Sequence, residues 1–212
     1  MRMSGLFVAA LVGSCLAGTA QAAAEVYTIE PFHTYPSFEV SHHGISYWRG
    51  KFGKTSGKIW LDREKQTGRL DITVDVASVD FGLAVMDQRA RSADWFDVEK
   101  FPTAKYVSDS ITFRKGVPVA VDGKFTLRGV TRPLKLDIVE FTCTEHPMFK
   151  REVCGADVRA QFDRRAFGMV EEVVNDNGTV RLQIQVEALK GDTLPAPPSM
   201  PPGAPPAGAP GK

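Results

Sequence analysis

The sequence lacks an excess of charge of either sign. Its 212 residues include 26 Lys and Arg against 25 Asp and Glu, which gives a formal net charge of +1. Proteins that bind nucleic acid usually carry a basic excess that offsets the phosphate charges. The even balance therefore argues against a nucleic-acid partner. The hydrophobic share of 43% is ordinary for a globular chain, so a folded core is expected.

Long hydrophobic runs are also missing, and no permanent membrane span is predicted. The apolar run from Leu6 to Ala17 follows Arg2 and is shorter than the roughly 20 residues of a transmembrane helix. Ala20-Gln21-Ala22 is an A-x-A cleavage site, so residues 1–22 are predicted to be a signal peptide that exports the protein to the periplasm. A lipoprotein is the alternative, because Val12-Gly13-Ser14-Cys15 resembles a lipobox whose Cys15 would carry the lipid.

Cysteine is scarce, with three residues in the chain. Removal of the signal peptide leaves Cys143 and Cys154, an even pair in an oxidising compartment, and this favours a disulfide. Two buried free thiols are the alternative. Two cysteines fall short of the four ligands that structural zinc sites use, and the sequence predicts no metal site.

Common catalytic motifs are missing as well. There is no G-x-S-x-G nucleophile elbow, no phosphate-binding loop and no reactive-cysteine context, so no catalytic residue and no cofactor are predicted. His33, His42 and His43 are interpreted as polar residues at a barrel rim. Adjacent residues of a strand point to opposite faces, so His42 and His43 cannot share a metal. The alternative is an enzyme for a small hydrophobic substrate, with His33 or His42 as general acid or base.

What the sequence does contain is alternation of period two, the pattern of half-buried strands. Phe38 and Val40 alternate with polar neighbours, and Leu70 to Val76 repeats the pattern. Asp122-Gly123 and Asn177-Gly178 are typical of two-residue hairpin turns. The count of about eight strands with short turns predicts an antiparallel barrel or a sandwich.

Two segments depart from this alternation. Leu83 to Asp94 holds good helix formers and predicts one short helix, which could close one end of a barrel. Residues 192–212 are dominated by Pro, Ala and Gly and predict a disordered tail. The folded domain is therefore expected to span residues 25–191, in a mainly β chain with one short helix.

Four short motifs follow one another between Val26 and Ala188. They are His33-Thr34 with Phe38, Val40 and His42, followed by Arg49-Gly50-Lys51-Phe52; Trp95 to Pro102; Leu127-Arg128-Gly129-Val130-Thr131-Arg132-Pro133-Leu134; and Asp163-Arg164 with Phe167-Gly168-Met169. In this order they resemble the motifs of the YceI-like family. The chain departs from that family at the helix, where Met86-Asp87-Gln88-Arg89-Ala90 stands in place of the Arg-Asp-x-His-Leu of many members.

The resemblance implies a lipocalin-like antiparallel β-barrel that holds an isoprenoid lipid, of polyprenyl or quinone type, in its interior. The protein would then be an exported, non-enzymatic carrier of that lipid. Each buried CH₂ group gains roughly 0.8 kcal/mol, so several isoprene units suffice for tight binding without charged contacts. A structural or stress-related scaffold without a ligand is the alternative, and the sequence is also compatible with a homodimer.

The site residues expected from this resemblance fall into two groups. The first group faces the barrel interior and would contact the apolar chain of the lipid. The second group would contact a polar head group at the mouth, and it is formed by His33, His42, Asp87 and Arg89. The first group consists of Phe38, Val40, Phe52, Trp60, Ile72, Val74, Phe113, Phe125, Leu127, Leu136, Ile138, Phe162 and Phe167.

Overall fold

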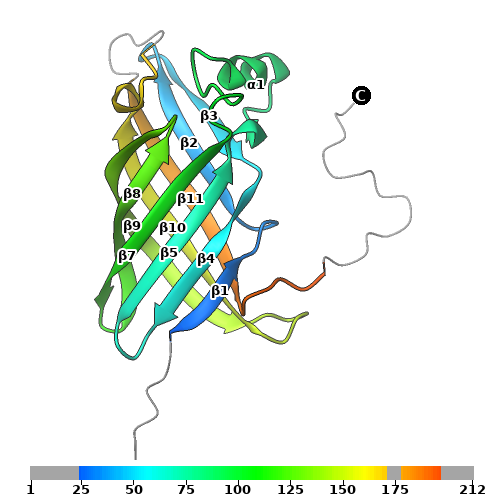
Figure 1. Ribbon diagram of the computed structural model, residues 1–212, viewed down its shortest axis with the longest axis vertical. Coiled ribbons are helices and arrows are strands. Elements are labelled where there is room, and N and C mark those ends of the chain that lie inside the picture. Colours follow the sequence, from blue (N-terminus) through cyan, green and yellow to red (C-terminus); the bar gives the residue numbers. More distant parts are fainter. Residues whose placement is uncertain (1–23, 171–177, 197–212) are drawn as a thin grey trace, which may run out of the picture.

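The protein forms an antiparallel β-barrel with a helix at one end, as a computed structural model of the chain shows (Figure 1). The structure describes residues 24–170 and 178–196. The predicted signal peptide with Cys15, Asn177 of the second predicted hairpin turn, and residues 197–212 of the predicted tail lie outside these ranges.

The barrel wall has eight positions, filled by eleven strands, because three positions each hold two strands in succession. The divided positions are β1 (Glu25–Ile29) with β2 (Tyr35–His42), β3 (Ser46–Phe52) with β4 (Thr55–Asp62), and β5 (Thr67–Asp75) with β6 (Val79–Asp80). The undivided positions are β7 (Thr103–Arg114), β8 (Val117–Leu127), β9 (Val130–Glu145), β10 (Glu152–Asp163) and β11 (Thr179–Lys190).

Strand β11 closes the barrel. Its first half pairs with β2, where Leu182 lies opposite Phe38, and its last residues pair with β1, where Ala188 lies opposite Ile29. Every other strand pair in the wall is also antiparallel, and the eight positions follow one another in chain order, which is the order of an up-and-down barrel. The prediction of about eight antiparallel strands closed into a barrel is confirmed.

The predicted short helix is confirmed as α1 (Ala84–Arg91), the single α-helix in the described ranges. The Asp87 carboxylate accepts a hydrogen bond of 2.7 Å from the Phe81 N–H, which fixes the chain just before the helix. Ala90 is fully buried and packs with Val79 and Phe38. The helix therefore lies against one end of the barrel, beside β3 and β6 (Figure 1).

The predicted hairpin turn at Asp122-Gly123 is wrong, because both residues lie inside β8. The observed turns on either side are Lys115-Gly116 and Arg128-Gly129, all four with positive φ. Gly123 leaves room for the ring of Tyr106, because a Cβ atom at this position would lie 2.5 Å from that ring. That ring crosses the glycine so that its hydroxyl reaches the carbonyl oxygens of Val121 and Leu134, at 3.1 and 2.9 Å.

The end of the barrel opposite α1 is closed by an ionic network and a disulfide. The Tyr27 hydroxyl donates a 2.5 Å hydrogen bond to Glu152, which also accepts from Arg63 at 2.9 Å. Lys190 donates to Glu25 at 2.5 Å. The predicted disulfide joins Cys143 and Cys154, which lie opposite one another on β9 and β10, and the second cysteine packs in the same buried cluster as Tyr27.

The network lowers the pKa values of its two carboxyl groups. The hydrogen bond from Lys190 lowers the pKa of Glu25. Burial acts in the opposite direction at Glu152, but the hydrogen bonds from Tyr27 and Arg63 outweigh it and the pKa is lowered there as well. Burial and the adjacent carboxylates raise the pKa of Tyr27, so its hydroxyl stays protonated and remains a donor.

Gly123→Ala should destabilise the protein by about 1–3 kcal/mol, because the added methyl group would overlap the Tyr106 ring inside a packed wall. Urea unfolding measures the change. Gly155→Ala on β10 is the matched control, since a Cβ atom there would meet its neighbours at 3.7 Å, an ordinary contact distance. Equal stability of the two variants would show that Tyr106 does not need this glycine.

The ionic network should make the protein acid-sensitive. Both carboxyl groups have folded-state pKa values below the ordinary 4.5, so unfolding takes up protons at low pH. Their contribution to the unfolding free energy is complete above pH 4.5 and is lost as the pH falls through the lower folded-state values. Glu152→Gln should reduce the unfolding free energy at neutral pH by on the order of 1–2 kcal/mol. The unfolding free energy of this variant should also fall less steeply as the pH is lowered.

Urea unfolding between neutral and acidic pH measures both effects. Glu140→Gln, an exposed position on the neighbouring strand β9, serves as the control. A Glu152→Gln protein whose stability falls with acid as steeply as that of the unchanged protein would contradict the assignment.

Candidate functional site

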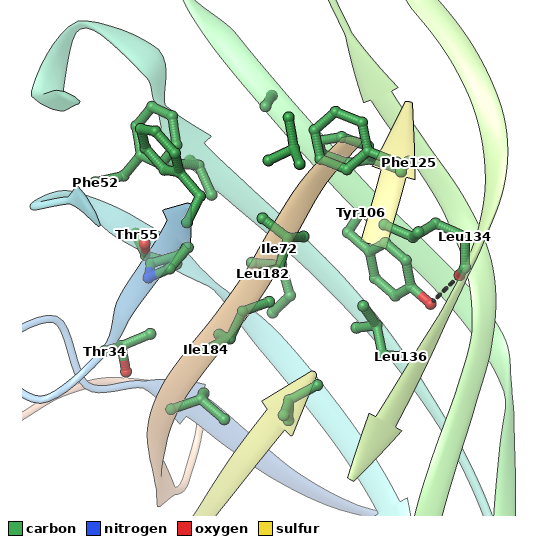
Figure 2. A pocket seen from close by; sticks show the side chains of 18 of the residues that line it. Thr34, Phe52, Thr55, Ile72, Tyr106, Phe125, Leu134, Leu136, Leu182 and Ile184 are labelled. Carbon is green, nitrogen blue, oxygen red and sulfur yellow. Dashed lines mark hydrogen bonds between the residues drawn. The ribbon is translucent and has the colours of Figure 1, made fainter. Parts of the chain in front are cut away.

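The barrel encloses an apolar cavity of about 490 Å³, which runs along its interior (Figure 2). Most of the side chains that line it come from the inner faces of the strands, as period-two alternation requires, and the rest come from α1, the β2–β3 turn and the connections near them. Strand β11 alone supplies Leu182, Ile184 and Val186, which alternate with the outward-facing Gln183 and Gln185. A volume of this size lies within the range of pockets that bury a drug-sized ligand.

Aromatic rings form the wall of the cavity near α1. The ring of Phe38 lies 5.5 Å from that of Phe52 and 5.3 Å from that of Phe81, and Phe52 lies 5.5 Å from Phe96. The Phe38 ring fits because Gly50 is opposite it on β3, where a Cβ atom would come within 2.7 Å of the ring. These rings give the upper part of the cavity a rigid apolar lining.

Most polar atoms inside the cavity are occupied by the protein itself. Thr34 bonds to the backbone of Glu187, and the Tyr106 hydroxyl bonds to the carbonyl oxygen of Leu134 (Figure 2). Burial raises the pKa of Tyr106 and keeps it neutral. Two buried atoms among the described residues have no hydrogen-bond partner, Thr55 Oγ1 and Trp95 Nε1, and both residues line this cavity.

The cavity opens at the β2–β3 turn. His43 in this turn is exposed, whereas every other described residue that lines the cavity is buried or half-buried. The expectation that His42 and His43 point to opposite faces is wrong: β2 ends at His42, His43 has a positive φ, and both line the cavity with rings 4.5 Å apart. The ring of His42 also lies 5.6 Å from Trp48. Arg89 of α1 also lines the cavity and donates a 3.0 Å hydrogen bond to Asp94. No carboxylate is among the described lining residues.

His33 lies outside the cavity, in the break between β1 and β2. Its Nδ1 is 2.7 Å from Glu30 and 3.9 Å from Glu187, and the possible ligand atoms of these three residues lie within 4.8 Å of one another. The Glu30 carboxylate already accepts the backbone N–H groups of Phe32 and His33. The cluster is therefore explained as a turn-stabilising arrangement, and its link to Glu187 could not be read from sequence spacing.

The requirements of the alternative enzyme hypothesis are divided between two histidines. An acid–base histidine needs a carboxylate partner and access to the substrate pocket. His33 has the carboxylate but does not line the cavity, and His42 lines the cavity without a described carboxylate within hydrogen-bonding distance of its ring. The geometry brings no described histidine–carboxylate pair into the cavity.

Ten of the thirteen side chains expected to face a lipid do line the cavity. Trp60 instead lies under Arg69, whose guanidinium carbon is 3.5 Å from the centroid of the Trp60 ring. Phe113 packs against the buried cluster at the closed end, and Phe167 packs behind Phe125 in the 3₁₀ helix η2 (Arg164–Phe167). The ten lining residues are Phe38, Val40, Phe52, Ile72, Val74, Phe125, Leu127, Leu136, Ile138 and Phe162.

Of the four residues expected near a head group, two line the cavity and two do not. His42 and Arg89 line the cavity near its mouth, whereas His33 and Asp87 do not line it. Asp87 is used to hold the chain before α1, as described above. Sequence reasoning missed Tyr106 and Trp95 as lining residues; the alternation of Ala104 with Tyr106 was the signal for the first.

A bulge explains how β9 keeps its apolar residues on the inside. Val158 pairs with Ile138 and the preceding Asp157 pairs with Glu140, so Val139 is the extra residue and is exposed. Beyond it the alternation shifts by one, and Phe141 faces the cavity together with Ile138. Period-two counting along β9 therefore fails at this residue.

No helix in the described ranges combines the length and hydropathy required to cross a lipid bilayer. Comparison with known proteins gives a consistent family signal. A sequence profile of the YceI-like domain matches residues 27–188. A UPF0312 protein of Shewanella denitrificans is 30% identical over 188 residues, which cover 86% of this chain and 97% of that protein.

Two solved structures share the fold at low sequence identity. The YCEI protein of Campylobacter jejuni has a TM-score of 0.61 and 21% identity, over 72% of this chain and 91% of that one. A polyisoprenoid binding domain from Saccharophagus degradans has a TM-score of 0.58 and 14% identity, over 80% of this chain and all (100%) of that one. At these identities the likeness establishes the barrel fold.

Leu182→Trp should block the cavity, because the larger ring would occupy space that is empty in the barrel interior. We expect the affinity for the neutral dye N-phenyl-1-naphthylamine to fall by more than about tenfold, with the unfolding free energy changed by less than about 1 kcal/mol since no packed neighbour is displaced. Gln183→Trp, the next residue on the same strand but facing outward, is the control. Equal dye binding by both variants would mean that the dye does not enter the cavity.

Proposed function

The chain belongs to the YceI-like family, and from that premise we propose that it is a non-enzymatic binding protein that carries an isoprenoid lipid inside its barrel. The observation that carries this proposal is the enclosed cavity of about 490 Å³, lined almost entirely by aliphatic and aromatic side chains. A long apolar chain is the kind of ligand that such a lining stabilises in water. The polyisoprenoid binding domain with the same fold supports this choice of ligand class.

The energetics of the proposal depend on apolar burial. Each CH₂ group that leaves water gains roughly 0.8 kcal/mol, and an isoprenoid chain offers many such groups and no charge. The lining residues Ile72, Leu136 and Leu182 are half-buried and present part of their apolar surface to the cavity. A lipid chain would cover this apolar surface without displacing any protein contact.

The two ends of the cavity give the proposed ligand an orientation. The end near β1 is closed by Tyr27, Arg63 and Glu152, so the hydrocarbon tail would point toward it. The head group would lie at the opposite end, near His42 and Arg89. A quinone ring or a polyprenyl head group fits this proposal, since both place a few oxygen atoms at the end of an apolar chain.

The proposed location of this carrier is the periplasm. The proposal rests on the sequence of residues 1–22 and agrees with the Cys143–Cys154 disulfide, which is typical of proteins from oxidising compartments. An isoprenoid lipid cannot cross an aqueous compartment unaided, and a closed barrel with an apolar interior would shield it there.

The protein purified from the cells that make it should contain a polyprenyl or quinone-type lipid. Native mass spectrometry should detect a one-to-one complex, and extraction with organic solvent should release the lipid for identification by its fragments. Leu182→Trp should carry much less of it than Gln183→Trp. A protein that yields no lipid on extraction and that binds no added isoprenoid after delipidation would contradict the proposed function.

A further inference from the structure

The mouth of the cavity carries a group of exposed apolar side chains. Ile45, in the same turn as His43, is 84% exposed, the largest value among the large hydrophobic residues of the described ranges. Tyr47 follows at the start of β3 with 44%. Leu83 and Val85, at the start of α1, are 48% and 64% exposed. We call these four residues the rim, because each lies within two residues of a side chain that lines the cavity at this end (His43, Trp48, Phe81 or Met86).

Ring contacts connect the two parts of the rim. The ring of Trp48, the neighbour of Tyr47, lies 5.6 Å from His42 and 6.2 Å from Phe81, which is two residues before Leu83. Met86 of α1 lines the same cavity as His42 and His43. The β2–β3 turn and the start of α1 therefore border one opening, and they lie at the same end of the barrel (Figure 1).

Exposed apolar residues elsewhere are arranged differently. Met148 lies in the β9–β10 turn and Val117 at the start of β8, both at the closed end, and Phe32 lies in the break between β1 and β2. Val107 and Val139 lie singly on β7 and β9, and Val170 follows η2. Scattered single residues of this kind are ordinary on protein surfaces. The rim differs because its four exposed side chains lie in two segments, the β2–β3 turn with the start of β3 and the start of α1, whose neighbouring residues line the same cavity.

We infer that the rim docks the barrel on the surface of a phospholipid bilayer, with Ile45 and Val85 inserted among the acyl chains. This inference rests on the proposed function, because an isoprenoid ligand is dissolved in a membrane and must pass from it through the mouth. Apolar and aromatic side chains that enter the interface provide such reversible attachment. The docked mouth would let the lipid move from bilayer to cavity without contact with water.

A second copy of the chain fits the rim less well than a bilayer. A stable protein interface uses roughly 20–30 residues on each side. The rim offers four exposed apolar side chains around an opening, and its most exposed residue stands at the tip of a narrow turn. A protruding apolar tip matches a deformable lipid surface, whereas a protein partner would have to supply a complementary pocket.

Vesicle flotation of the mature chain, from which residues 1–22 have been removed, tests the inference, because the apolar run of those residues would itself bind vesicles. The probe is vesicles of phosphatidylethanolamine and phosphatidylglycerol, and intact mass spectrometry of each protein verifies that residues 1–22, with Cys15, are absent. The Ile45→Gln/Val85→Gln protein should bind vesicles about tenfold more weakly than its parent, because two apolar side chains are lost from the interface. Met148→Gln is the matched control, since Met148 is 63% exposed at the closed end against 64% for Val85.

Three outcomes would overturn the inference: no flotation of the parent protein, equal loss in the Met148→Gln control, or a dimer that the rim substitutions dissociate in size-exclusion chromatography. Binding of a polyprenol or quinone in detergent solution is measured alongside and should be unchanged by the rim substitutions. If the parent protein binds no such lipid in detergent, the proposed function fails. If it binds the lipid but does not use the rim on vesicles, only the docking inference fails.

Discussion

Closure of the sheet through β11 is the constraint on which the rest of the structure depends. One strand satisfies the backbone of β2 along its first half and of β1 along its last residues, so the wall has no unpaired edge at that seam. A closed wall of eight positions is wide enough to hold a ligand, and its backbone hydrogen bonds are made within the wall. The interior can therefore stay partly empty without leaving buried backbone groups unpaired.

The two ends of this closed wall are built from different chemistry. Tyr27, Arg63, Glu152 and the nearby disulfide tie three strands (β1, β9 and β10) and the β4–β5 turn together at one end. At the other end the contacts are between aromatic rings, and the chain leaves an opening beside His43. Ion pairs and a covalent bond close one end, while the other end keeps the exposed lining residue His43. In the proposed function the α1 end is therefore the entry for the ligand.

Glycine positions decide which large side chains can face inward. Phe38 lies over Gly50 and Tyr106 lies over Gly123, each on a neighbouring strand and each at a distance that a Cβ atom would not permit. In both pairs the ring uses the volume that the glycine leaves free, and so it lies flat against the wall and does not fill the lumen. The open space inside the barrel thus depends on two glycines, Gly50 and Gly123.

The sequence by itself determined the alternation of strands, the short helix, the pairing of Cys143 with Cys154 as a disulfide and the family motifs, because these are carried by neighbouring residues or by residue type. Tertiary structure decided the rest. Trp60 stands between the lining residues Ile59 and Leu61 and therefore lies on the outer face, under Arg69. Phe113 follows the alternation of the lining residue Ile111, yet it packs against the buried cluster at the closed end. Asp122-Gly123 has the composition of a turn but lies under the ring of Tyr106. Tertiary structure decides which face of each strand is inside. It also decides where a bulge such as Val139 shifts the alternation and which glycine faces which ring. All three depend on contacts between neighbouring strands, and these contacts form only when the barrel closes.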